Sequence, residues 1–166
     1  MIVLGIDPGT ANTGFGVISS DGRVVRALAH GSVKTRPRDD MAIRLAQIQR
    51  AIEELIEEHR PDAVALESLF IGANPRTILA VGQARGVVLA SCGVRGIASS
   101  EYAPAQIKSA LCGSGRADKQ QVGRVVTMTL ALREQPRSDH AADALAVALC
   151  HAWSSRAHAV LARAGS

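Results

Sequence analysis

Aromatic residues are scarce in this chain. They make up 2% of its 166 residues, and only Phe15, Phe70, Tyr102 and Trp153 are present. The core must therefore be filled by aliphatic side chains, which the 47% of hydrophobic residues can supply. This length and composition suit one globular domain with a sizeable core.

Cysteine is also rare, and its three copies (Cys92, Cys112 and Cys150) are scattered and form no CxxC pair. This argues against a structural zinc site or a disulfide framework and favours a reducing compartment. The N-terminus has no basic run before its apolar stretch, and we expect no segment to be long and apolar enough to span a bilayer. We expect a cytoplasmic protein with no membrane partner.

Lysine is the third scarce residue. Lys34, Lys108 and Lys119 are the only copies, so nearly all of the positive charge comes from arginine. The net charge is +4. A basic domain of this size suggests an acidic partner, of which nucleic acid is the commonest, although many basic proteins bind no DNA.

Hydrophobic periodicity predicts three strands, then alternating helices and strands, then helices. The expected strands are 2–7, 14–18, 24–33, 63–66 and 94–98. The expected helices are 41–56, 75–92, about 103–111, 118–130 and 139–153. This order predicts an α/β fold, a mixed five-stranded sheet with helices on both faces. The sequence contains no repeat or linker, so residues 1–153 are expected to form one domain and 154–166 a short, frayed tail.

Two acids stand at the ends of predicted buried strands: Asp7 ends the first, and Glu67 ends the fourth. A buried carboxylate is costly unless something compensates its charge. If these strands are neighbours, the two carboxylates face each other and repel unless a cation or proton lies between them. Oxygen ligands of this kind suit Mg²⁺ or Mn²⁺.

A third set of candidate ligands lies in Asp139-His140-Ala141-Ala142-Asp143. On a helix, His140 and Asp143 share a face, and Asp139 and Asp143 nearly do. Either pair can point toward the strand ends, but Asp139 is more readily explained as a helix cap. We predict that Asp7, Glu67, His140 and Asp143 form a two-metal site of the kind that hydrolyses phosphodiesters.

Four motifs resemble RuvC, the family of bacterial Holliday-junction resolvases. They are GIDPGT at 5–10, ESLF at 67–70, GQARGV at 82–87 and DHAADALA at 139–146. The resemblance runs from residue 2 to about residue 153, in order and with the family's spacing. It implies an RNase H-like nuclease domain, a homodimer that nicks two strands symmetrically, a requirement for Mg²⁺ or Mn²⁺, and cooperation with the RuvA–RuvB branch-migration complex.

The resemblance assigns roles to individual residues. Asp7, Glu67 and Asp143 match family carboxylates, whereas His140 stands where many members have Asp and some have His. Imidazole is a softer ligand than carboxylate and favours Mn²⁺ over Mg²⁺. His140 is also a candidate general base, or a residue that orients the attacking water. The sequence leaves these roles open.

The resemblance also suggests DNA contacts. Phe70 matches an aromatic residue near the junction centre, where it can stack on an unpaired base, although packing in the core is an alternative. Lys108 and Lys119 match basic positions that hold the scissile phosphate. Further candidates for phosphate contacts are Arg76, Arg85 and Arg116.

The leading hypothesis is thus a structure-selective endonuclease that leaves 5′-phosphate and 3′-hydroxyl ends. Gly82 and Gly86 lie one helical turn apart and suit either close packing at a dimer interface or packing on the chain's own sheet. Two alternatives remain. The Asp-Pro-Gly-Thr turn also resembles a phosphate loop of actin-like ATPases, which need a second lobe, and a YqgF-type nuclease acting on RNA shares the first motif.

Overall fold

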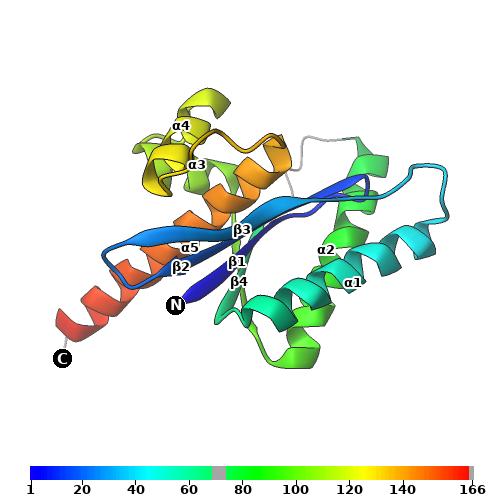
Figure 1. Ribbon diagram of the computed structural model, residues 1–166, viewed down its shortest axis with the longest axis horizontal. Coiled ribbons are helices and arrows are strands. Elements are labelled where there is room, and N and C mark those ends of the chain that lie inside the picture. The colour runs from blue at the N-terminus through cyan, green and yellow to red at the C-terminus, as the bar shows by residue number, and fades with distance from the viewer. Residues whose placement is uncertain (69–73, 165–166) are drawn as a thin grey trace.

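The structure, a computed structural model, describes residues 1–68 and 74–164, and of 156–164 the backbone alone. A five-stranded sheet lies between two layers of helices (Figure 1). The strands are β1 (Ile2–Asp7), β2 (Asn12–Ser20), β3 (Val25–Lys34), β4 (Ala63–Glu67) and β5 (Ala98–Tyr102). The helices are α1 (Met41–His59), α2 (Pro75–Arg95), α3 (Pro104–Cys112), α4 (Lys119–Thr129) and α5 (Asp139–Ala164).

The sheet has the order β3-β2-β1-β4-β5. The first three strands pair antiparallel, whereas β1–β4 and β4–β5 are parallel pairs, so the mixed sheet is confirmed. Ile6 pairs with Leu66, which brings the C-terminal ends of β1 and β4 to the same edge. Asp7 and Glu67 are the last residues of these two strands.

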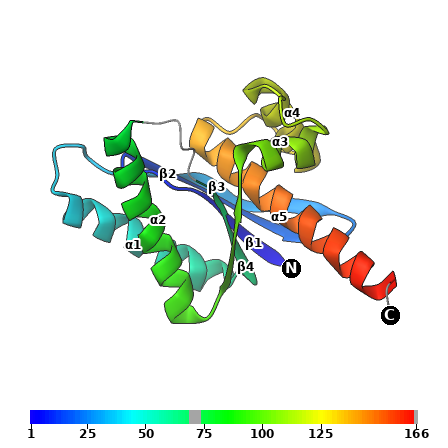
Figure 2. The ribbon, with the colours of Figure 1, turned by 180° about the vertical axis from the view of Figure 1, so that it is seen from behind.

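Alternate residues of the central strands point to two separate cores. Leu4 and Ile6 pack with the buried side chains of α1 and α2 on one face. Val3 and Ala65 pack with α3, α4 and α5 on the other face. Figure 2 shows the two helix layers from behind. The prediction of helices on both faces is therefore confirmed.

Helix α5 lies directly on the backbone of β1 and β2. A Cβ atom at Gly14 would be 2.0 Å from the carbonyl oxygen of His140, and one at Gly5 would be 2.0 Å from that of Ala144. Only glycine permits this approach. The contact places the first turn of α5 beside the end of β1.

The predicted strand 94–98 is wrong. Helix α2 continues to Arg95 and ends at Gly96, which has a φ of 64°. The strand begins at Ala98 and reads Ala-Ser-Ser-Glu-Tyr, with its first two residues exposed. β5 is an edge strand and is too polar to give the continuous apolar run by which buried strands are recognised.

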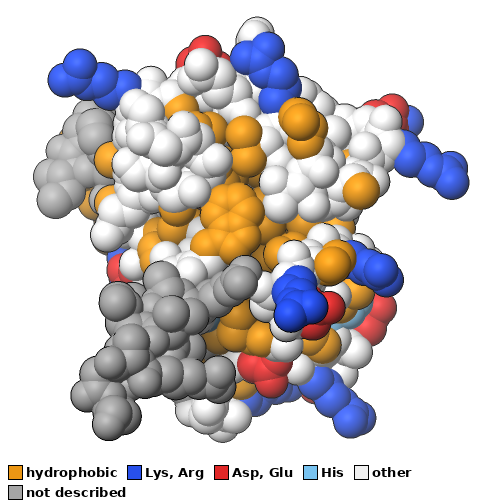
Figure 3. All heavy atoms as spheres, turned by 90° about the vertical axis from the view of Figure 1, so that its left-hand side faces the viewer, with side chains coloured by type: hydrophobic (Ala, Val, Ile, Leu, Met, Phe, Trp, Pro, Cys, Tyr) orange, Lys and Arg blue, Asp and Glu red, His pale blue; other side chains and the backbone are white. Residues whose placement is uncertain are grey.

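The last helix begins at Asp139, as predicted, and runs to Ala164, past residue 153. The boundary placed at 153 therefore falls within a helix, and the division of the chain there stays a prediction. Hydrophobic side chains reach the surface at the end of the molecule that carries the C-terminus (Figure 3).

Helix α2 also corrects the reading of membrane segments. By length and composition alone it could cross a bilayer, because an 18-residue stretch of it has a mean hydropathy of 1.5, and 22% of that stretch is buried. The sequence reading overlooked it because glycines and alanines, rather than large apolar residues, make up much of the helix. Its buried residues, including Ala84 and Val88, pack in the core with α1.

Candidate active site

Asp7 and Glu67 line one hollow of about 310 Å³ at the edge where β1 and β4 end. The predicted juxtaposition of these two strand ends is thus found. Burial, together with the nearby carboxylates of Asp7 and Asp143, raises the pKa of Glu67 to about 7. Lys119 and Lys108 oppose this shift. Three acids therefore share one electrostatic environment.

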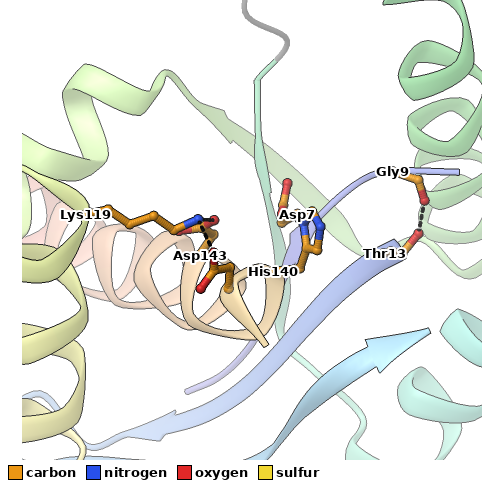
Figure 4. Close-up of polar contacts among 7 residues, drawn as sticks. Asp7, Gly9, Thr13, Lys119, His140 and Asp143 are labelled. Carbon is orange, nitrogen blue, oxygen red and sulfur yellow. Dashed lines mark hydrogen bonds and ion pairs between the residues drawn. The ribbon is translucent and has the colours of Figure 1, made fainter. Parts of the chain in front are cut away.

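His140 reaches Asp7 from the first turn of α5. Its Nδ1 lies 2.6 Å from Oδ2 of Asp7. Figure 4 shows the two side chains next to each other. A carboxylate can only accept a hydrogen bond, so with Asp7 ionised Nδ1 carries the proton. In a neutral ring, Nε2 then keeps its lone pair, which is the form that ligates a metal or accepts a proton.

Asp143 contacts a lysine instead. Lys119 Nζ lies 3.3 Å from Oδ2 of Asp143 and 3.2 Å from Oδ2 of Asp139. Burial raises the pKa of Asp143, and Lys119 acts against this. Partial burial alone would lower the pKa of Lys119, but Asp143 and Asp139 raise it above its usual value.

These contacts distinguish the two helical pairings that the sequence allowed. Asp139 and Asp143 both contact Lys119, but Asp143 is 29% exposed and lines the hollow beside Glu67, whereas the side chain of Asp139 is 79% exposed. Asp139 is the first residue of α5 rather than the residue that caps it. The preferred explanation of Asp139 as a cap is therefore wrong.

A second hollow of about 240 Å³ lies on the other side of Glu67. Lys108, Lys119 and Asp143 line it, and it shares Glu67 and Pro104 with the first hollow. Glu67 therefore lies between two spaces, one beside Asp7 and His140 and the other beside the two lysines.

The donor set suits Mg²⁺ or Mn²⁺ in its chemistry, with three carboxylates and an imidazole. Burial is the main cause of the raised pKa of Glu67, and repulsion by Asp7 and Asp143, which a cation would relieve, adds to it. In the described part of the chain, however, no three His, Cys, Asp or Glu side chains converge closely enough to hold a metal ion. Instead, His140 contacts Asp7 and Lys119 contacts Asp143.

The predicted DNA contacts lie in different surroundings. Arg76 is exposed in the first turn of α2 and lines a hollow with Asn12 and His140. Arg116 is exposed before α4. Arg85 pairs with Glu101 and ties α2 to β5, so its side chain is already engaged. Phe70 lies outside the described residues.

Three residues that the sequence analysis missed brace the β1–β2 turn. The fully buried Thr13 hydroxyl donates to the carbonyl oxygen of Gly9 over 2.6 Å (Figure 4). The Thr35 hydroxyl donates to the carbonyl oxygen of Thr10, and the buried Arg44 Nε donates to Thr35 over 2.9 Å. The available signals were polar residues at buried positions, such as Arg44 on the buried stripe of α1.

Comparisons with known proteins identify the family of this chain. Residues 3–151 match the family model described as "Crossover junction endodeoxyribonuclease RuvC". The RuvC of Syntrophomonas wolfei is 47% identical over 156 residues, which cover 94% of this chain and 91% of that protein. The RuvC of Moorella thermoacetica is 46% identical over 167 residues, which cover 98% and 100% respectively.

A solved structure, "T. thermophilus RuvC in complex with Holliday junction substrate", superposes with a TM-score of 0.92 at 39% identity. The match covers 95% of this chain and 96% of that one, so the expected RNase H-like fold is confirmed. The chain belongs to the RuvC family of crossover junction endodeoxyribonucleases.

Proposed function

We propose that this protein is a structure-selective endonuclease that resolves Holliday junctions by symmetric paired nicks in recombination and repair. The observation that carries the proposal is the placement of Asp7, Glu67, Asp143 and His140 along two adjoining hollows that share Glu67. The family match favours a DNA junction over the RNA substrate or the ATPase activity considered from the sequence.

Phosphodiester hydrolysis requires an activated water and stabilisation of the leaving oxygen. Two divalent ions, Mg²⁺ or Mn²⁺, would supply both when bound. Attack of water on phosphorus with cleavage of the P–O3′ bond leaves 5′-phosphate and 3′-hydroxyl ends. Asp7, Glu67 and Asp143 provide carboxylate oxygens, with His140 as the fourth ligand. The bond between Asp7 and His140 leaves Oδ1 and Nε2 free to ligate, whereas Asp143 would exchange its contact with Lys119.

His140 has a second role open to it. Its hydrogen bond to Asp7 orients the ring and leaves Nε2 to accept a proton from water or to orient the attacking water. The ring is 44% exposed, so substrate and water can reach it.

Lys108 and Lys119 hold the scissile phosphate in this proposal. Both line the hollow next to Glu67. As compact charges, they can contact phosphate oxygens without a fixed geometry. Release of Lys119 from Asp143 would then transfer its charge to the DNA and free the carboxylate. Arg76 contacts the backbone farther along, and Phe70 stacks on a base at the junction centre.

A homodimer follows from the symmetry of the substrate, because a two-fold protein presents two matched sites to a two-fold junction. Helix α2 has an exposed face on which Leu79 is 67% exposed. A Cβ at Gly82 or Gly86 would meet nothing within 4 Å, so these glycines do not pack on the chain's own sheet. We place the dimer interface on this face. The RuvA–RuvB complex is the expected partner, and the cytoplasm the expected location.

The decisive experiment is cleavage of a synthetic four-way junction, with linear duplex as control, in Mg²⁺ and then in Mn²⁺. We expect paired nicks in the junction and little cutting of duplex. Asp7→Asn should keep junction binding but lower cleavage by about 10²-fold or more, since a metal ligand contributes several kcal/mol. A variant that still cuts at the wild-type rate in Mg²⁺ would remove Asp7 from the mechanism.

A further inference from the structure

A larger hollow lies beside the proposed active site. It has a volume of about 830 Å³ and runs between the end of β3 and the segment 132–138 that joins α4 to α5. We call it the β3 groove. Asp139 and His140 also line it, so the groove opens next to the first turn of α5.

The β3 groove carries positive charge that the protein does not neutralise. Its cations are Lys34, Arg133 and Arg137, all exposed. Its acids are already engaged: Glu134 lies 3.8 Å from Arg137, and Asp139 pairs with Lys119. Within the residues that the structure describes, Lys34 and Arg133 have no ion-pair partner.

The groove is continuous with the catalytic residues. His140 lines the β3 groove, the hollow of Asp7 and Glu67, and the hollow of Arg76. Asn12 likewise lines both the β3 groove and the hollow of Arg76. The phosphate groups of one nucleic-acid strand can therefore lie along a continuous path from Arg76, past the proposed catalytic residues, to Lys34 and Arg133.

Both walls of the groove are held by backbone contacts. Lys34 is paired with Asn12 in the sheet, and the next residue, Thr35, donates its N–H to the carbonyl oxygen of Ala11 over 3.1 Å. On the other wall, the N–H of Leu132 bonds the carbonyl oxygen of Thr127 over 3.0 Å. The backbone around Lys34 and Arg133 is therefore already ordered before any ligand binds.

We propose that the β3 groove binds the sugar–phosphate backbone of one double-stranded arm of the DNA, as the continuation of the strand cut at Asp7, Glu67 and Asp143. This inference rests on the proposed nuclease function. An acidic peptide could also bind exposed cations, but the continuity with the site of phosphodiester cleavage favours DNA. Contacts of this kind fix the position of the substrate without reading its sequence.

The test compares two double variants that remove the same charge. Lys34→Ala with Arg133→Ala empties the groove of its unpaired cations. Arg23→Ala with Arg26→Ala is the matched control, since Arg26 lies at the far end of the same strand, about 27 Å from Lys34. Junction affinity is measured against salt concentration without divalent metal. We expect the groove variant to lower the slope of log K against log salt by about 1.8, or 0.9 per lost phosphate contact.

The control variant should keep the slope of the wild type. Equal losses in both variants would overturn the proposal, because general charge would then explain them. Lys34→Gln with Arg133→Gln should reproduce the groove effect with longer side chains. On a junction whose arms are cut to a few base pairs, the groove effect should vanish, and its persistence would overturn the assignment to an arm.

Two further outcomes separate the proposals. If the wild type shows no preference for a junction over duplex, but the groove variant still lowers the slope on duplex, the junction function fails and the groove proposal stands. If the wild type resolves junctions and the groove variant keeps the full slope, only the groove proposal fails. Loss of poly-glutamate binding with unchanged DNA binding would instead identify an acidic protein partner and overturn the proposal.

Discussion

At the scale of one residue, Glu67 shows that the site lowers the free energy of unfolding of the protein at neutral pH. Burial and the neighbouring carboxylates raise its pKa from 4.5 to about 7, so the folded state holds this proton more tightly than the unfolded chain. The contribution to the free energy of unfolding is therefore greatest below pH 4.5 and is lost as pH rises through about 7. At neutral pH and above, the ionised side chain destabilises the fold.

Glu67→Gln should accordingly stabilise the metal-free protein at pH 8, by up to about 3 kcal/mol, and have little effect near pH 4.5. Urea unfolding at the two pH values measures this. Glu54→Gln, an exposed change on α1, is the matched control. Added Mg²⁺ should stabilise the wild type but not Glu67→Gln. A Glu67→Gln variant that is less stable than the wild type at pH 8 would contradict the electrostatic account.

His140 determines the choice of metal in the proposed mechanism. Replacing its imidazole by a carboxylate in His140→Asp should shift the ratio of cleavage rates in Mn²⁺ and Mg²⁺ toward Mg²⁺, on the order of tenfold. His59→Asp, at the end of α1, controls for the added charge. An unchanged ratio would mean that His140 does not ligate the metal.

At the scale of elements, the sequence was most informative where a strand is buried on both faces. β1 and β4 are continuous apolar runs that end in an acid, and both their position and the meeting of Asp7 with Glu67 follow from that pattern. β5 was misplaced because its polar residues lie on an edge strand. Hydrophobic periodicity reveals the buried positions of a strand, and an edge strand has few such positions.

The contacts within the site were less accessible to prediction. Spacing placed His140 and Asp143 on one helical face, but it gave neither the rotation of α5 nor the rotamers. Consequently, the bond of His140 to Asp7 and that of Lys119 to Asp143 could not be foreseen. They depend on how α5 rests on β2, which is a tertiary contact between residues more than a hundred positions apart.

The close packing of α5 on β2 gives a prediction at the scale of elements. Gly14→Ala should force α5 away from the sheet, because the new Cβ would overlap the His140 carbonyl oxygen. We expect a loss of about 1–3 kcal/mol in the free energy of unfolding and a larger loss of cleavage than of DNA binding. Gly123→Ala in α4, where the new Cβ meets only the Gln135 side chain at 3.7 Å, should instead gain about 0.5–1 kcal/mol. Equal stabilities for the two variants would refute the close approach.

At the scale of the whole molecule, the exposed face of α2 is the surface that the proposed dimer needs. Leu79→Glu should convert the dimer to monomers in analytical ultracentrifugation, because a charge would be buried at the interface. Paired nicking should then become single nicking. Ile43→Glu is the matched control, an aliphatic residue of α1 that is 51% exposed. If both variants dissociate the dimer, or if neither does, the interface does not lie on the exposed face of α2.

Gly5 and Gly14, which lie beneath α5, determine which substitutions this part of the protein tolerates. Where Gly5 and Gly14 meet the carbonyl oxygens of Ala144 and His140, main chain touches main chain, and no rotamer lies between them. The spacing between α5 and the strand that carries Asp7 is therefore set at these two points by contacts between backbones. A side chain at either glycine would push α5 away from the sheet, so changes at these two positions alter that spacing more directly than changes within the cores.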